Sequence, residues 1–503
     1  MTSSSQSPVL AGRTLDLSRP SHYLFIALIM GLMGAFFWAV RGHAGANLMQ
    51  PALGWGLLWL YFSNRDRNGE KRPLSTPWIM LAITFGLLFG SGGWGAYISW
   101  VHPGTFYLDI SRPETGRDIA PWIGYATLFF TGLLRGGVLG ACMSWCYPSA
   151  QINWKGWVLR VASGVAGAFA MYYIVKGFPQ FFLPFYGEGI YDNPENRSAI
   201  RALNTHLGNA PTLGFFFGFL VFEMVRRDWK AVGIMVIMAL GFAVFMSAGA
   251  YWFTFRAITD IPIDWWKNWE MSVGLGAGLA FGLIFYLYNQ PVSDATSYRF
   301  SARSWIIGAG FPIWFGSTLM FRNFYSDGLT HEYYGLFATL GLDLPFDPGH
   351  YTLFTIMYLI PVSIVFFLFA RRAHHPEKMI LQNIGFITVL VLFSLALFFP
   401  QVFYSLGLFI PTRMLYLIPA MTLLAVFLYH PKSAFNGMEE GAYPIPDWLV
   451  VMFLAIIATI GMIMNLDPSM PFHNHFLMYT YSILMVVSLV LYFRIPRVGA
   501  SGP

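Results

Sequence analysis

Charged residues are scarce in this chain of 503 residues, where they make up only 11% of the sequence. Soluble globular proteins carry about 25% charged residues, so the composition excludes an ordinary water-soluble enzyme. Cysteine is almost absent too, and two residues cannot build a disulfide framework. A Walker A loop and a G-x-S-x-G nucleophile elbow are both missing from the sequence. These absences argue against a pump or redox carrier with its own nucleotide domain.

Hydrophobic residues, in contrast, make up 56% of the chain and gather in long runs. A helix needs about 20 mostly apolar residues to cross ~30 Å of hydrocarbon. With that window the sequence predicts fourteen transmembrane helices, starting near residues 22, 45, 77, 121, 157, 207, 231, 268, 304, 351, 379, 408, 447 and 472. Such runs are too long for the strands of an outer-membrane barrel. We therefore expect an all-α polytopic integral membrane protein.

Composition divides the predicted spans into two groups. The first eight, over residues 22–290, are rich in Gly and Ala, and six Leu- and Phe-rich spans follow over 304–494. A tail at 1–21, a linker at 291–303 and a tail at 495–503 complete the chain. Small residues at every fourth position let membrane helices approach closely, and the even-numbered spans carry such glycines, for example Gly132, Gly136 and Gly140. Similar aromatic span ends suggest that the first eight spans derive from degenerate helical-hairpin repeats.

The positions of Lys and Arg predict the orientation of the chain. If the N-terminus lies in the cytoplasm, the inside loops hold roughly twice as many of the 30 basic residues as the outside loops, as the positive-inside rule requires. This places both termini in the cytoplasm and suits a bacterial-type plasma (inner) membrane. The net charge of +6 is then a property of the cytoplasmic loops, and it is no argument for binding nucleic acid.

Two of the charged residues that are predicted to lie within the membrane are candidate site residues. Arg135 is fourteen residues into the fourth span, and Glu223 is twelve residues after Pro211 in the sixth. At 1.5 Å per residue both would lie near mid-bilayer, at similar depths. They would form a buried ion pair if their helices are neighbours. Alternatively, Arg135 would face a polar cavity and bind an anion, because an intramembrane charge commonly marks a functional site.

A second group of candidates lies at the predicted outer ends of the spans: Arg41, His43, Arg256, Trp266, Trp269 and Glu270. Tryptophans at the interface are expected of any membrane protein, but arginines are disfavoured on the outer face. Guanidinium forks match carboxylate or phosphate groups, and tryptophan faces suit cations or apolar groups. We expect Arg41 and Arg256, which end two similar Trp-containing spans, to converge on one ligand.

These features favour a transporter for an anionic or partly apolar small molecule, or a lipid-linked one, that enters from the outer face. One alternative is a membrane-embedded transferase that uses a lipid-linked, phosphate-containing donor at that face. A second is a non-catalytic subunit of a membrane complex. The histidine spacings match no zinc signature, so we expect no metal and no cofactor. The expected partners are membrane lipids and the anionic ligand.

Overall fold

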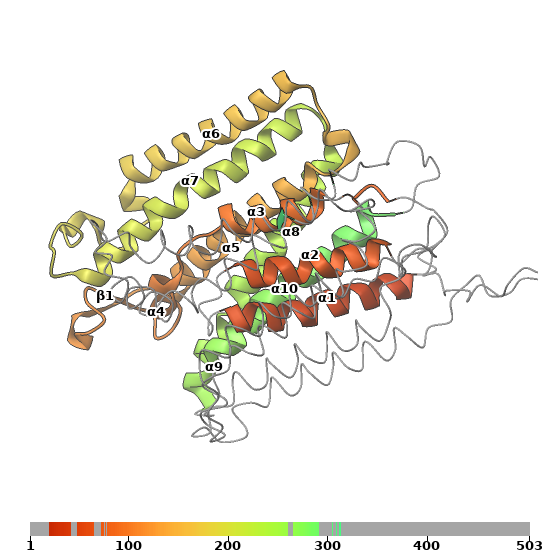
Figure 1. The fold of residues 1–503 in the computed structure, drawn as a ribbon. Coiled ribbons are helices and arrows are strands. Elements are labelled where there is room, and N and C mark those ends of the chain that lie inside the picture. The colour runs from red at the N-terminus through yellow and green to blue at the C-terminus, as the bar shows by residue number, and fades with distance from the viewer. Residues whose placement is uncertain are drawn as a thin grey trace, which may run out of the picture.

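The structure, a computed structural model, describes residues 20–41, 48–64, 72–74, 76, 78–259 and 265–290, with isolated positions between 304 and 312. Over these ranges the chain is almost entirely helical, and its long helices lie roughly along one direction (Figure 1). The six spans predicted for 304–494 fall outside the described residues, apart from the isolated positions. The number of fourteen spans, the repeat hypothesis and the two-part division of the chain therefore stay predictions.

Eight helices of the described residues coincide with the first eight predicted spans. They are α1 (Pro20–Arg41), α2 (Met49–Asn64), α3 (Trp78–Phe89), α5 (Pro121–Ser144), α6 (Trp154–Gly177), α7 (Arg197–Val225), α8 (Trp229–Ala248) and α10 (Trp265–Tyr288). Five helical segments are long and apolar enough to cross a membrane: α5, α6, α7, the segment Trp229–Thr259 and α10. The helical class and the presence of several helices able to span a bilayer are thus confirmed.

Shorter elements connect the helices at one end of the bundle. A 3-10 helix (Gly95–Tyr97) and α4 (Ile98–Val101) precede a small antiparallel hairpin of β1 (Thr105–Tyr107) and β2 (Gly116–Asp118). The 3-10 helices Pro179–Phe181 and Tyr186–Glu188 lie between α6 and α7, and α9 (Tyr251–Thr259) follows α8. Two further 3-10 helices, Pro113–Thr115 and Pro148–Ala150, complete the described elements. We name the end that carries β1 and β2 the hairpin end.

Glycines bring three pairs of helices into backbone contact: α1 with α10, α5 with α8, and α6 with α7. A Cβ on Gly278 of α10 would overlap the Met30 carbonyl of α1, and one on Gly136 of α5 would overlap the Met238 carbonyl of α8. In the pair that Figure 1 shows side by side, a Cβ on Gly218 of α7 would overlap the Ser163 carbonyl of α6. The predicted close packing through small residues is therefore confirmed for these helices.

The structure corrects two predicted helix boundaries. The sixth helix begins at Arg197 and not near 207, so α7 is 29 residues long and starts among residues assigned to an outer loop. The third predicted span starts near 77 and needs about 20 residues, but α3 ends at Phe89 and the chain then passes through a glycine-rich turn. Four glycines between residues 90 and 95 explain the break, since glycine is a poor helix former.

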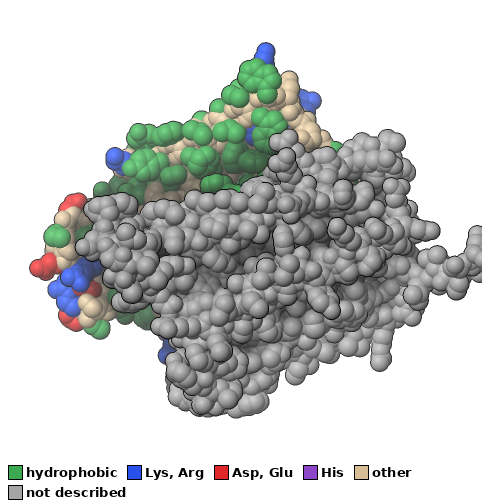
Figure 2. Space-filling model, viewed as in Figure 1, with side chains coloured by type: hydrophobic (Ala, Val, Ile, Leu, Met, Phe, Trp, Pro, Cys, Tyr) green, Lys and Arg blue, Asp and Glu red, His purple; other side chains and the backbone are tan. Residues whose placement is uncertain are grey.

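The outward face of α6 is apolar. Its exposed side chains include Trp154, Leu159, Val165, Phe169 and Tyr173. Figure 2 shows the same feature as a band of hydrophobic side chains over the α6–α7 region, with Lys and Arg near the ends of the band. An exposed apolar surface of this length would be unfavourable in water. It suits a helix pair whose outer surface contacts lipid.

Candidate functional site

Arg135 lies inside the bundle, where its side chain is only 2% exposed. Its Nη2 donates a hydrogen bond to the Gly92 carbonyl at 3.0 Å, and its guanidinium stands over the Trp38 ring at 5.0 Å from the ring centre. Arg135 therefore joins three elements: its own helix α5, helix α1 through Trp38, and the turn after α3 through Gly92. Arg135 is thus buried within the protein, and its depth in the membrane stays a prediction.

The pairing of Arg135 with Glu223 is wrong. The Glu223 carboxylate accepts hydrogen bonds from Arg160 Nε at 2.7 Å and from Arg226 Nη1 at 2.6 Å. Glu223 and Arg160 are fully buried, and Arg160 also donates to the Ala150 carbonyl. Glu223 lies in the last turn of α7, which ends at Val225, and so it is close to the end opposite the hairpin. Its role in the described structure is to tie α6 and α7 to the loop after α5.

Glu270 and Trp269 are buried in the first turns of α10. Lys267 Nζ lies 2.5 Å from the Glu270 carboxylate and donates to the Ala39 carbonyl near the end of α1, at 3.1 Å. The Trp269 indole donates to the Met246 carbonyl of α8 at 2.9 Å. These bonds fasten the hairpin end of α10 to α1 and α8. Both residues were expected at a ligand-binding rim, but their described contacts are with the protein.

The other rim residues have different surroundings. Arg256 is exposed on α9. Trp266 is 37% exposed, and its ring centre lies 5.2 Å from that of Trp94. The Arg41 side chain and the whole of His43 fall outside the described residues, so the convergence of Arg41 with Arg256 stays a prediction. Of the six rim candidates, Trp266 is the one that the structure places at a cavity.

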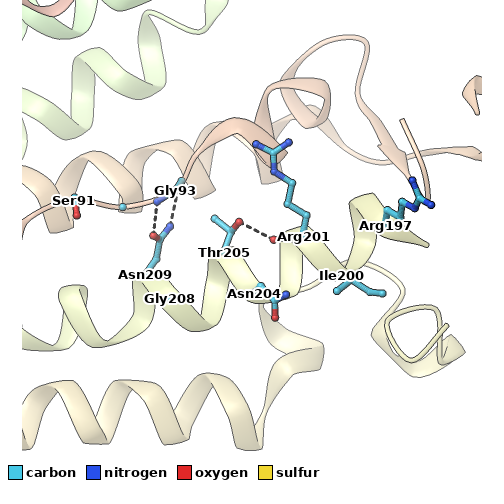
Figure 3. Close-up of a pocket in the computed structure, with 10 residues that line it drawn as sticks. Ser91, Gly93, Arg197, Ile200, Arg201, Asn204, Thr205, Gly208 and Asn209 are labelled. Carbon is cyan, nitrogen blue, oxygen red and sulfur yellow. Dashed lines mark hydrogen bonds between the residues drawn. The ribbon is translucent and has the colours of Figure 1, made fainter. Parts of the chain in front are cut away.

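A polar cavity of about 730 Å³ opens at the hairpin end, between α7 and the turn that follows α3 (Figure 3). Its lining comes from Ser91, Gly92, Gly93, Arg197, Ile200, Arg201, Asn204, Thr205, Gly208 and Asn209. One wall is the first three turns of α7, which presents side chains at helical spacing. The opposite wall is the backbone of the glycine-rich turn. Gly92 connects this cavity to Arg135, because Arg135 holds the Gly92 carbonyl from inside the bundle.

Asn209 holds the turn against α7. Its side-chain amide donates to the Gly93 carbonyl at 2.9 Å, and its side-chain oxygen accepts from the Gly93 N–H at 2.9 Å. The helix and the turn approach closely here, since a Cβ on Gly93 would lie 2.7 Å from Thr205 Cγ2 and one on Gly92 would lie 2.8 Å from the Asn209 side-chain oxygen. A larger residue at either position would therefore push the turn away from α7.

A second cavity, of about 590 Å³, adjoins the first and is largely aromatic. Its aromatic lining residues are Trp94, Trp100, Phe106, Tyr107 and Trp266. The other lining residues are Gly93, Gly95, Ala96, Ile98, Ser99, His102, Ile110, Ser198 and Arg201. The two cavities share Gly93 and Arg201. Arg201 Nη2 would lie 3.0 Å from a Cβ on Gly95, so its guanidinium rests against the backbone at the boundary between the cavities.

The polar cavity is positive. Two of its lining residues, Arg197 and Arg201, are arginines one helical turn apart, both are exposed, and none of the lining residues is acidic. The carboxylate nearest in sequence to the aromatic lining is Asp109, which accepts bonds from the Ser111 hydroxyl and N–H at 2.8 and 3.0 Å. These bonds, followed by the charges of Arg112 and Arg197, hold the pKa of Asp109 below its ordinary value. Asp109 is thus ionised and committed to its own loop.

Sequence reasoning missed the glycine-rich turn and Arg201 as parts of one site. The signal was present, because the run Gly90-Ser-Gly-Gly-Trp-Gly95 breaks a helical pattern and such runs mark turns. Among the described residues, no group of three His, Cys, Asp or Glu side chains could hold a metal ion. In comparisons with known proteins, no family model, no curated protein and no solved structure matches this chain.

Proposed function

We propose that the protein is a multi-pass membrane transporter that admits an anionic small molecule at the hairpin end of the bundle. The observation that carries the proposal is the polar cavity, where Arg197 and Arg201 face solvent and no lining residue is acidic. Guanidinium groups bind carboxylates and phosphates through paired N–H donors.

The orientation of the chain supports entry from outside the cell. The distribution of Lys and Arg assigns the loop at 102–120, and with it the hairpin, to the outer face. Lys and Arg are generally less frequent in outer loops than in cytoplasmic ones. A ligand-binding role would explain why arginines are present on the outer face. Arg135 lies behind the turn that walls the cavity and holds the Gly92 carbonyl from inside the bundle.

Transport is tested on purified protein reconstituted in liposomes, with uptake of radiolabelled phosphate and benzoate as probes. We expect uptake above that of empty liposomes for at least one probe, and a reduction of at least tenfold in the Arg201→Gln variant. Lys176→Gln, which removes an exposed cation at the end of α6, is the matched control and should transport normally. Uptake that is the same with and without protein for both probes would contradict the proposal. So would an Arg201→Gln variant that transports as wild type.

A further inference from the structure

The geometry points to a ligand with two parts, an anionic group held in the polar cavity at Arg201 and a flat or apolar body held in the aromatic cavity. We infer that the substrate class is an amphiphilic anion, such as an aryl or alkyl carboxylate or phosphate. This inference rests on the proposed function, because it assigns the remainder of a ligand whose charged part the polar cavity receives.

The two cavities form one continuous site because they share a wall. Gly93 and Arg201 line both of them. The Arg201 guanidinium lies against the backbone at Gly95, which belongs to the aromatic cavity, while its stem rises from the α7 wall of the polar cavity (Figure 3). A charged group bound to Arg201 therefore sits at the junction. Any substituent it carries can extend past Gly93 into the aromatic cavity.

The aromatic side chains of the second cavity suit the apolar body of a ligand. Trp94 and Trp266 lie with ring centres 5.2 Å apart, and Trp100 lies 5.5 Å from Phe106. The Trp100 ring is in turn stacked on His206, whose ring is 5.9 Å away, so this wall is supported from behind. Aromatic rings favour stacked or edge-on partners at these separations. At about 730 and 590 Å³, each cavity also has the size usual for small-ligand sites.

Trp266 is the residue that tests this assignment. It comes from α10, so it can be changed without touching the α7 wall, and it is partly exposed in the described structure. Removing one stacking partner typically lowers affinity by a factor of up to about ten, or about 1.4 kcal/mol. Ile110, at 67% exposure, lines the same cavity from the hairpin loop and provides a second variant. Trp122 is 68% exposed at the start of α5 and lies outside both cavities, which makes Trp122→Ala the matched control.

The experiment is calorimetric titration of detergent-purified full-length protein with two matched pairs of probes, acetate with benzoate and phosphate with phenyl phosphate. We expect the aryl member of at least one pair to bind at least tenfold more tightly. Trp266→Ala or Ile110→Ala should reduce this advantage to about threefold or less, while Arg201→Gln weakens both members and Trp122→Ala changes neither. Lysophosphatidic acid is titrated in parallel, and tighter binding than phenyl phosphate would identify a lipid as the source of the amphiphilic anion.

The outcomes separate this inference from the function on which it rests. If the simple anions bind in an Arg201-dependent way but the aryl members have no advantage, the two-part ligand is refuted and the proposed function stands. The inference is equally refuted if an aryl advantage exists and survives in both Trp266→Ala and Ile110→Ala. If no probe binds to wild-type protein, both proposals fail together.

Discussion

Replacing Gly93 by Ala should destabilise the protein by forcing the glycine-rich turn away from α7. A Cβ at this position would lie 2.7 Å from Thr205 Cγ2, whereas carbon atoms in ordinary contact are about 3.5–4.0 Å apart. Because the Thr205 hydroxyl is hydrogen-bonded to the Arg201 carbonyl, we expect the turn to retreat by about 1 Å. The two hydrogen bonds of Asn209, both 2.9 Å long, would then be broken or badly stretched. At about 0.5–1.5 kcal/mol for each bond, the expected loss is roughly 1–3 kcal/mol.

The assay is thermal unfolding of the detergent-purified protein, followed by intrinsic tryptophan fluorescence. Thr205→Ser removes the Cγ2 atom that the new methyl group meets and keeps the hydroxyl, so the double variant Gly93→Ala/Thr205→Ser should recover most of the loss. Gly208→Ala is the control, because Gly208 lines the same cavity and a Cβ there meets nothing within 4 Å. Equal unfolding temperatures for Gly93→Ala and Gly208→Ala, or a double variant no more stable than Gly93→Ala, would refute the reasoning.

Three further results are expected. Glu223→Ala should lower the free energy of unfolding by about 3–5 kcal/mol, because it leaves the buried Arg160 without its carboxylate. The double variant Arg160→Met/Glu223→Leu should unfold at a higher temperature than Glu223→Ala. The same stability in both variants would disprove the pair's role. The pKa of Asp109 is lower in the folded protein than in the unfolded chain, so the ionised carboxylate stabilises the fold. This stabilisation is present above the unfolded pKa and is lost as the pH falls through the folded pKa. Unfolding temperatures that depend on pH identically in wild type and Asp109→Asn would contradict this. Single cysteines at 112 and 327, in a background without Cys142 and Cys146, should react with an impermeant reagent from outside, and cysteines at 67 and 374 should not; the reverse pattern would invert the orientation.

The helices of the first half could be predicted from sequence because their signal is local. Long apolar runs bounded by charged loops place the starts of seven of the eight helices to within a few residues, α7 being the exception. Glycines four apart correctly mark the faces where α5 meets α8 and where α10 meets α1. In a membrane these contacts depend on small residues that let backbones approach, and the spacing of such residues is visible in the sequence.

The partners of the buried charges could not be predicted, because they depend on which residues of neighbouring helices lie at the same level. Glu223 is two residues before the end of α7, and its neighbour there is Arg160 of α6 in place of Arg135. The earlier start of α7, at Arg197, makes Arg201 part of a cavity wall in place of a loop residue. Polar residues such as Arg197 and Asn204 hide the helical pattern of the first turns of α7, since apolarity is what marks a span.

The central claim is that an anion binds at Arg201, between the glycine-rich turn and the tryptophans of the aromatic cavity. A cryo-electron microscopy map of the purified protein with benzoate tests it most directly. The account predicts ligand density within hydrogen-bonding distance of the Arg201 guanidinium, with the ring extending past Gly93 toward Trp266, and loss of that density in Arg201→Gln. Density beside Arg256 with an empty Arg201 site, or a map in which the Arg201 cavity is filled by the chain itself, would contradict it.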